Sequence, residues 1–162
     1  MLIVLEGIDG CGKTTLAETL APILDAKIIH ATRETPNNWN WFCDILQDSI
    51  NQNIIADRFF WGQFAYQSPS ERNITEDQLH RLEKMMRDYG GKIIYVQASW
   101  PTVSKRLAAR EEQLSCSYMH LVNAYAELIH NSYCPVLIYD TEEMEMADTR
   151  VGESMEDKLN ED

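Results

Sequence analysis

The glycine-rich segment Gly7–Thr14, which reads G-x-x-x-x-G-K-[ST], constrains the fold of this chain more than any other feature. It follows Leu2–Glu6, which has the pattern of a buried strand, and it runs into an amphipathic helix predicted over Thr14–Leu24. In this order, backbone N–H groups and the positive end of a helix dipole converge on one point. The sequence therefore predicts a phosphate-binding loop rather than a surface turn that happens to contain a lysine.

The residue types of this loop predict a bound nucleoside triphosphate with Mg²⁺. Lys13 can reach the β- and γ-phosphates, and the hydroxyl of Thr14 can bind the metal. The other candidate cofactor-binding residues of the loop are Gly7, Asp9, Gly10, Cys11, Gly12 and Thr15.

Strands and helices are predicted to alternate along the chain. The expected strands are Leu2–Glu6, Lys27–His30, Asn53–Ala56, Lys92–Gln97 and Val136–Tyr139. The expected later helices are one that carries Trp41, Ile45, Leu46 and Ile50, then Phe59–Gln67, Thr75–Tyr89, Ser99–Glu112 and Ser117–Asn131. This order predicts an α/β, three-layer P-loop NTPase fold, a five-stranded parallel sheet flanked by helices. Active residues should gather at the carboxyl ends of the strands.

The negative charge of the chain is concentrated at its end. The net charge is −12, and residues 140–162 contain ten acidic residues against two basic ones. This balance does not favour a nucleic-acid partner, which requires clustered lysine and arginine. Residues 141–162 are expected to form a solvated acidic tail, with a short helix around Thr141–Ala147 as an alternative.

Neither membrane insertion nor zinc binding is favoured by the sequence. It has no apolar run of membrane-spanning length and no signal-peptide pattern, so we expect a cytoplasmic protein. The four cysteines show no zinc-ligand spacing and are expected to be reduced thiols: Cys11, Cys43, Cys116 and Cys134.

Charged residues outside the loop form three further candidate sites for binding phosphate or Mg²⁺. Arg33 follows the second predicted strand, where it could bind a phosphate or pair with Glu34 on the surface. Asp57 ends the third strand and could hold Mg²⁺. Arg106 and Arg110 share a helix face, as in a cationic lid or a solvated helix.

Aromatic residues follow Asp57 at high density. Phe59, Phe60, Trp61 and Phe64 could form a stacking surface, but this density is more typical of core.

Four motifs give the chain a resemblance to the thymidylate kinase family of nucleoside monophosphate kinases. They are E-G-I-D-G-C-G-K-T-T at Glu6–Thr15, A-T-R-E at Ala31–Glu34, D-R-F at Asp57–Phe59 and A-Y-Q at Ala65–Gln67. The segment R-L-A-A-R at Arg106–Arg110 adds weaker support. The resemblance covers about half of the chain, chiefly residues 2–67.

The resemblance implies a role for each matched residue. Asp9 would lie near the acceptor sugar, Arg33 and Arg58 would bind the acceptor monophosphate, Gln63 would face the pyrimidine edge, and Tyr66 would crowd the sugar 2′ position. The implied catalytic residues are Lys13, Asp57, Arg58, Arg106 and Arg110, with Thr14 and Asp57 as metal ligands. Residues 1–140 would form the kinase domain, with a lid near 105–116, and the chain would form a homodimer. The apolar residues Leu79, Leu82 and Met86 could serve that dimer or form core.

The chain departs from the family where a base would be read. The segment between Glu34 and Asp57 is short and contains no arginine or lysine. Trp39, Trp41 or Phe42 could replace the ring that stacks on the base.

Three functions follow from these observations. The first is Mg²⁺-dependent transfer of the γ-phosphoryl group of ATP to a deoxynucleoside monophosphate, dTMP or a related pyrimidine. The second is a P-loop kinase that acts on a nucleoside or on a modified pyrimidine in DNA. The third is a nucleotide-binding switch without turnover, although the chain lacks the N-K-x-D motif that reads guanine in switch GTPases.

Overall fold

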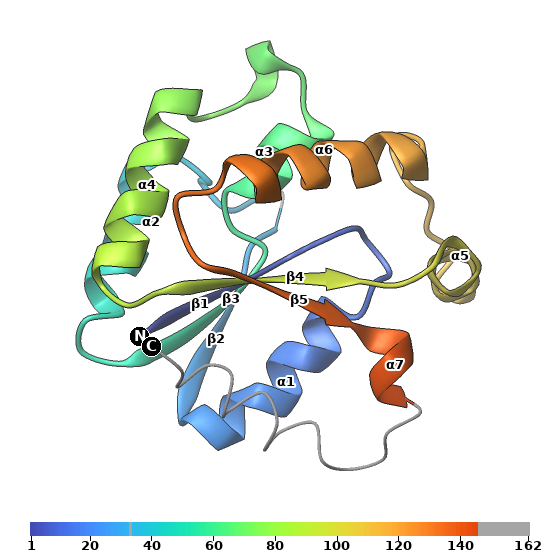
Figure 1. Ribbon diagram of the computed structural model, residues 1–162, viewed down its shortest axis with the longest axis horizontal. Coiled ribbons are helices and arrows are strands. Elements are labelled where there is room, and N and C mark those ends of the chain that lie inside the picture. Colours follow the sequence, from blue (N-terminus) through green and yellow to red (C-terminus); the bar gives the residue numbers. More distant parts are fainter. Residues whose placement is uncertain (33, 146–162) are drawn as a thin grey trace.

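The computed structural model describes residues 1–32 and 34–145, and a single five-stranded sheet forms its centre (Figure 1). The strands are β1 (Leu2–Glu6), β2 (Ala26–His30), β3 (Asn53–Asp57), β4 (Lys92–Gln97) and β5 (Val136–Asp140). All neighbouring strands are parallel, in the order β2-β3-β1-β4-β5. The predicted fold class is therefore confirmed.

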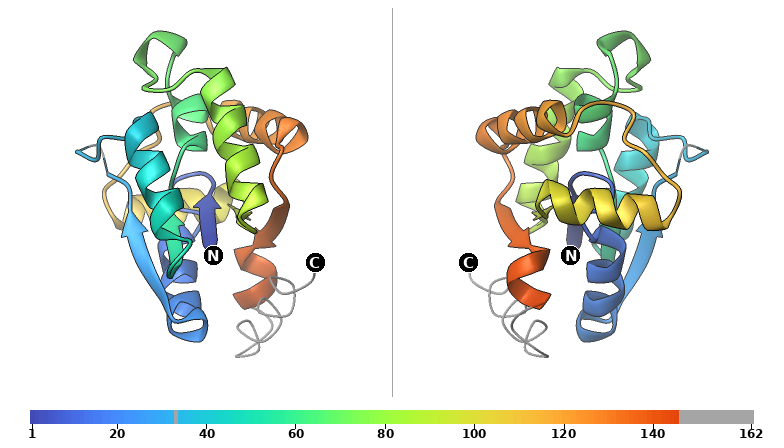
Figure 2. Two further views of the ribbon diagram at one scale, coloured as in Figure 1. Left: turned by 90° about the vertical axis from the view of Figure 1, so that its left-hand side faces the viewer. Right: turned by 90° about the vertical axis from the view of Figure 1, so that its right-hand side faces the viewer.

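Helices cover both faces of this sheet and give the molecule three layers. The helices are α1 (Lys13–Leu24), α2 (Trp39–Asp48), α3 (Trp61–Tyr66), α4 (Glu76–Asp88), α5 (Trp100–Ala109), α6 (Tyr118–Asn131) and α7 (Thr141–Glu145). In Figure 1, α2, α3, α4 and α6 lie above the sheet, whereas α1 and α7 lie below it. Helix α5 lies beyond the carboxyl ends of the strands (Figures 1 and 2).

Burial explains why the central strands form. All five residues of β1 are buried, as are the four inner residues of β4, which fits strands covered on both faces. The aromatic segment after β3 joins this core: Phe59, Phe60 and Trp61 are buried, and the rings of Phe42 and Phe59 meet edge to face at 4.7 Å. The core interpretation of these aromatics is confirmed.

Several helices are shorter than the sequence predicted. Helix α5 ends at Ala109, three residues before the expected Glu112, and Glu111 then takes a positive φ of 56°. The segment predicted to be helical over 59–67 is helical only over α3. Ile50 lies after the end of α2 and is exposed. Helix α4, by contrast, begins within one residue of the predicted start, and Thr75 and Gln78 form both hydrogen bonds of a capping box there.

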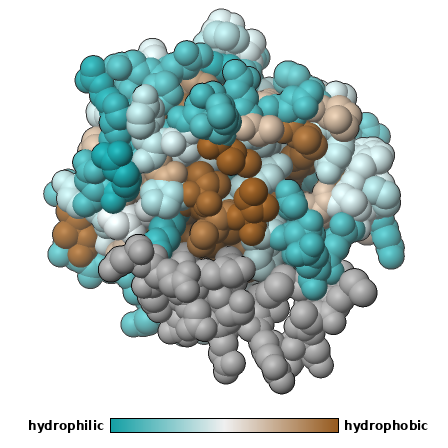
Figure 3. Space-filling view, in the orientation of Figure 1, coloured by the Kyte–Doolittle hydropathy of each residue, from teal (hydrophilic) through white to brown (hydrophobic). Residues whose placement is uncertain are grey.

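The exposed and buried apolar residues bear on the predicted homodimer. Leu79, Leu82 and Met86 are buried, so they form core rather than an exposed dimer face. An apolar patch faces the viewer over the edge strand β5, where Ile138 is 60% exposed (Figure 3). Among the described residues, no helix combines the length and the apolar character needed to cross a membrane. A homodimer and a cytoplasmic location stay predictions.

The C-terminal prediction falls partly outside the described residues. The short helix considered around Thr141–Ala147 is present as α7, and it begins directly after β5. Residues 146–162, which hold most of the predicted acidic tail, lie outside the described residues, and so does Arg33.

Candidate active site

The glycine loop leaves β1 at the carboxyl edge of the sheet and returns into α1, as its sequence predicts. Gly12 has a φ of 104° at the N-cap of α1. Gly7 has a φ of 146°, and a Cβ atom there would lie only 2.2 Å from the carbonyl oxygen of Val96. A side chain at position 7 would therefore collide with the backbone of β4, which explains why the chain requires glycine at the first position of the loop.

The Lys13 side chain lies beneath this loop and is only 4% exposed. Its Nζ atom donates to the carbonyl oxygens of Gly7 (2.8 Å) and Ile8 (2.9 Å), and it lies 3.8 Å from Oδ1 of Asp9. The ammonium group is therefore held by the first residues of the loop. The backbone N–H groups of the same loop would face a phosphate chain.

The two predicted metal ligands are in direct contact. Thr14 Oγ1 donates to Asp57 Oδ2 over 2.6 Å, although the residues are 43 positions apart in the chain. His30 Nδ1 lies 3.1 Å from the same carboxylate oxygen, because β2 and β3 pair His30 with Asp57. A hydroxyl and a carboxylate are both hard oxygen donors, so this pair fits Mg²⁺.

Asp9 of the loop contacts both Arg58 and Tyr66. Arg58 donates to Oδ1 of Asp9 over 2.6 Å, and the backbone N–H of Asp9 donates to the Tyr66 hydroxyl over 2.9 Å. Burial and the neighbouring Asp9 carboxylate raise the pKa of Tyr66, so its phenol stays protonated. Arg58 has a positive φ of 69°, a strained backbone conformation of the kind that clusters at functional sites.

The Gln63 amide, predicted to face a pyrimidine edge, lies between Asn37 and Asn73. Its Nε2 donates to the carbonyl oxygen of Asn37 (2.7 Å), and its Oε1 accepts from the backbone N–H of Asn73 (2.7 Å). Both ends of the amide are therefore engaged with backbone, and Gln63 is buried. Of the three rings considered for stacking, Phe42 is buried in the core, which leaves the half-buried Trp39 and Trp41.

The two predicted lid arginines border the cavity above the loop. This cavity has a volume of about 760 Å³ and is also lined by the loop, His30, Asp57 and Arg58. Arg106 donates to the carbonyl oxygens of Gly10 (3.3 Å) and Cys11 (3.2 Å), whereas Arg110 follows α5 and pairs with Glu112 at 3.4 Å. The structure therefore brings the Arg106 side chain from α5 to the loop, and Arg110 borders the same cavity.

Two further residues of this region, His30 and Glu6, had no role predicted from the sequence, although His30 ends a strand at the same sheet edge and Glu6 opens the glycine-loop motif. Glu6 is the last residue of β1, is fully buried, and accepts from the backbone N–H groups of Phe59 (3.0 Å) and Trp61 (2.9 Å). Burial raises the pKa of Glu6 to about 7, against these two hydrogen bonds and the charges of Lys13 and Arg58. The signal in the sequence that could have identified Glu6 is a carboxylate at the end of an otherwise apolar strand.

Comparison with known proteins supports a relationship to P-loop nucleotide kinases. No protein-family model matches the chain. The chain is 26% identical over 147 residues to the SPbeta prophage-derived protein YorR of Bacillus subtilis, across 86% of this chain and 88% of YorR. It is also 26% identical over 142 residues to a thymidylate kinase of Campylobacter concisus, across 68% of this chain and 72% of that enzyme.

Solved structures agree on the fold. The crystal structure of YorR in complex with phosphorylated GDP has a TM-score of 0.71 at 24% identity, with both chains covered in full. The structure of deoxyadenosine kinase from M. mycoides with bound dCTP has a TM-score of 0.58 at 20% identity, with 99% of each chain covered. At these identities the similarity establishes the fold alone, and that fold is the one used by P-loop nucleoside and nucleotide kinases.

Proposed function

We propose that this chain is a Mg²⁺-dependent kinase that transfers the γ-phosphoryl group of ATP to a deoxynucleoside monophosphate. The observation that carries this proposal is an arginine held at the glycine loop in addition to Lys13 and the Thr14–Asp57 pair. Oδ1 of Asp9 lies 2.6 Å from Arg58 and 3.8 Å from Nζ of Lys13, and Arg58 lines the same cavity as Lys13, Thr14 and Asp57. A loop that only bound a nucleotide would have no use for this additional cationic group.

On the donor side, the loop N–H groups and Lys13 would hold the β- and γ-phosphates, as the helix N-terminus of α1 favours anions. Thr14 and Asp57 would hold Mg²⁺, which neutralises phosphate charge when bound. Arg106 and Arg110 would bring further positive charge to the transferring group and exclude water from the cavity.

On the acceptor side, Arg58 would exchange part of its contact with Asp9 for the acceptor phosphate, assisted by Arg33. A phosphate oxygen is already anionic at neutral pH, so such an acceptor requires no general base. Catalysis then rests on positioning and on charge neutralisation. Asp9 and Tyr66 would border the acceptor sugar.

For the base, we propose a pyrimidine such as that of dTMP, with Trp39 or Trp41 as the stacking ring. Gln63 could read a base edge only after releasing Asn37 or Asn73. The YorR structure is a complex with phosphorylated GDP, so purine nucleotides belong in the test beside pyrimidines.

The decisive experiment is a coupled phosphotransfer assay with ATP and Mg²⁺. The acceptors are dTMP, dUMP, 5-hydroxymethyl-dUMP, dCMP, dGMP and dAMP, and Lys13→Ala serves as the inactive control. Turnover with one pyrimidine monophosphate, abolished by EDTA and by the control substitution, is the expected result. ATP binding without transfer to any monophosphate would contradict the proposal.

A hydroxyl acceptor is the second candidate, either a nucleoside or a modified pyrimidine in DNA. It is favoured by the engaged state of Gln63 and by the fold shared with a deoxyadenosine kinase. Phosphorylation of deoxynucleosides or of hydroxymethylated DNA, with no reaction of monophosphates, would select it. Nucleotide binding with no transfer to monophosphates or to hydroxyl acceptors would favour the third function, a nucleotide-binding switch without turnover.

A further inference from the structure

Arg58 and helix α3 carry the acceptor side of the candidate active site, yet the start of α3 has no local side-chain cap. The helix is six residues long, and Phe60 at its N-cap position provides no side-chain hydrogen bond. Its first backbone N–H, that of Trp61, donates instead to Oε1 of Glu6, 55 positions earlier in the chain. The same oxygen also accepts from Phe59. Glu6 therefore caps α3 from the end of β1.

The residues that follow Glu6 belong to the phosphate-binding loop, so this cap joins the two sides of the site. Arg58 donates its backbone N–H to the carbonyl oxygen of Leu5 over 3.0 Å, directly beside Glu6. At the other end of α3, the Tyr66 hydroxyl accepts from the backbone of Asp9. The segment from Arg58 to Tyr66 is thus fixed at both ends to β1 and the loop.

We propose that Glu6 is a positioning residue that holds Arg58 and α3 in register with the phosphate-binding loop. The left-handed backbone of Arg58 requires such a restraint, because residues in this conformation persist only where the surroundings enforce it. The inference rests on the proposed function to the extent that Arg58 binds the acceptor.

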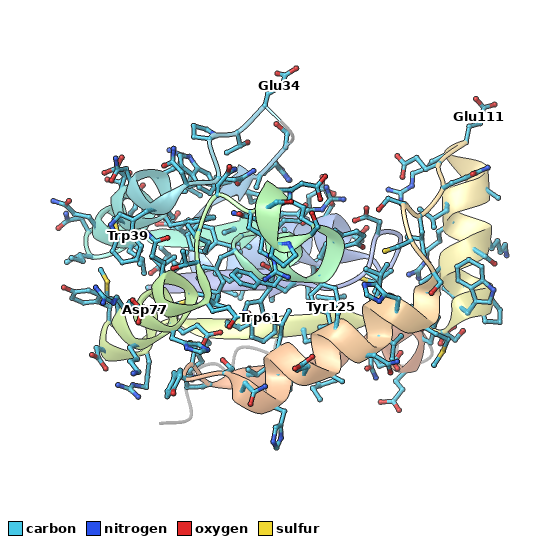
Figure 4. The ribbon with its side chains drawn as sticks, turned by 90° about the horizontal axis from the view of Figure 1, so that it is seen from above. Glu34, Trp39, Trp61, Asp77, Glu111 and Tyr125 are labelled. Carbon is cyan, nitrogen blue, oxygen red and sulfur yellow. The ribbon has the colours of Figure 1, made fainter. Side chains whose placement is uncertain are left out.

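Only one oxygen of Glu6 performs this task. Within the described part of the chain, Oε2 is buried and accepts no hydrogen bond. The charged or titratable groups that interact with Glu6 are Lys13, Arg58 and Tyr125, whose hydroxyl donates to the carbonyl oxygen of Gly7. Trp61 and Tyr125 lie near the centre of the molecule between α3 and α6 (Figure 4). A glutamine would keep an acceptor in the Oε1 position, whereas an aspartate would keep the carboxyl group but withdraw the acceptor by one C–C bond.

The test compares Glu6→Gln with Glu6→Asp, and it uses Glu83→Gln as a matched control. Glu83 is a second buried carboxylate that contacts Trp61, but it accepts from the indole Nε1 and lies on α4, away from the loop. We expect Glu6→Asp to raise the acceptor KM at least 10-fold with little change in the dissociation constant of ATP. Glu6→Gln should stay within about 3-fold of wild type, and Glu83→Gln should leave the acceptor KM unchanged.

A second measurement does not depend on turnover. Hydrogen–deuterium exchange of peptides that cover residues 58–66 should be faster in Glu6→Asp than in Glu6→Gln. If the wild type phosphorylates no acceptor, the proposed function fails, and this comparison still tests the role of Glu6. Equal exchange in the two variants, or an equal acceptor KM, would overturn the inference.

Discussion

The buried carboxyl group of Glu6 should make the free energy of unfolding depend on pH in a way that Glu6→Gln removes. Burial raises its folded-state pKa from 4.5 to about 7. Because the raised pKa belongs to an acid, the stability that Glu6 contributes is full below pH 4.5 and is lost as the pH rises through about 7. In this window the folded state binds a proton that the unfolded state has already released.

The expected change in the free energy of unfolding follows from the pKa shift of Glu6. One pKa unit corresponds to about 1.4 kcal/mol, so the full difference is about 3.4 kcal/mol. Between pH 5.5 and pH 8 the wild type should lose about 2 kcal/mol of this stability. The range starts at pH 5.5 because the sequence pI is about 4.7 and the protein is then still negatively charged.

Urea unfolding of wild type and Glu6→Gln across this pH range provides the assay. With an m-value of about 2 kcal/mol per M urea, the difference between their midpoints should change by about 1 M. Other ionisable groups affect both proteins alike and cancel in the comparison. Parallel pH profiles for the two proteins would refute the reasoning, since they would mean that Glu6 is ionised in the folded state throughout.

Three further substitutions test the candidate site. Thr14→Ala should raise the Mg²⁺ concentration for half-maximal rate about 10-fold or more, because the partner of Asp57 is lost; an unchanged Mg²⁺ titration would contradict the metal assignment. Arg106→Ala should lower kcat by about 10³-fold and Arg110→Ala by less than about 10-fold, because Arg106 lies against the loop. Single-turnover rates of the two variants measure this difference. A larger loss for Arg110→Ala than for Arg106→Ala would make Arg110 the catalytic lid residue. Gly7→Ala should destabilise the fold by about 3 kcal/mol or more, measured by urea unfolding, because its Cβ would overlap the backbone of β4; a smaller loss would mean that the loop can move away.

The phosphate-binding loop could be predicted from the sequence because its determinants are local. The strand pattern of β1, the glycines and the start of α1 are contiguous, and their physics depends on residues a few positions apart. The meeting of Thr14 with Asp57 could also be anticipated, because parallel strands bring their carboxyl ends to one edge. Motif resemblance added Arg58 and Tyr66, which the structure brings to Asp9.

The environment of Gln63 could not be predicted in the same way. The resemblance directed this side chain to a base, whereas the structure engages its amide with Asn37 and Asn73. These partners lie 26 and 10 positions away in irregular segments, for which the sequence contains no periodic signal. The end of α5 at Ala109 was missed because helix termini depend on turn geometry, here the positive φ of Glu111.

The sequence by itself determined the fold class and the position of the phosphate-binding loop, because apolar periodicity and glycine placement act over short stretches of chain. Only the tertiary structure decided which polar groups far apart in the sequence form hydrogen bonds with one another. Glu6 capping α3 and His30 beside Asp57 are contacts across 55 and 27 positions. Such contacts depend on strand order and register, which long-range packing sets, so no local pattern encodes them.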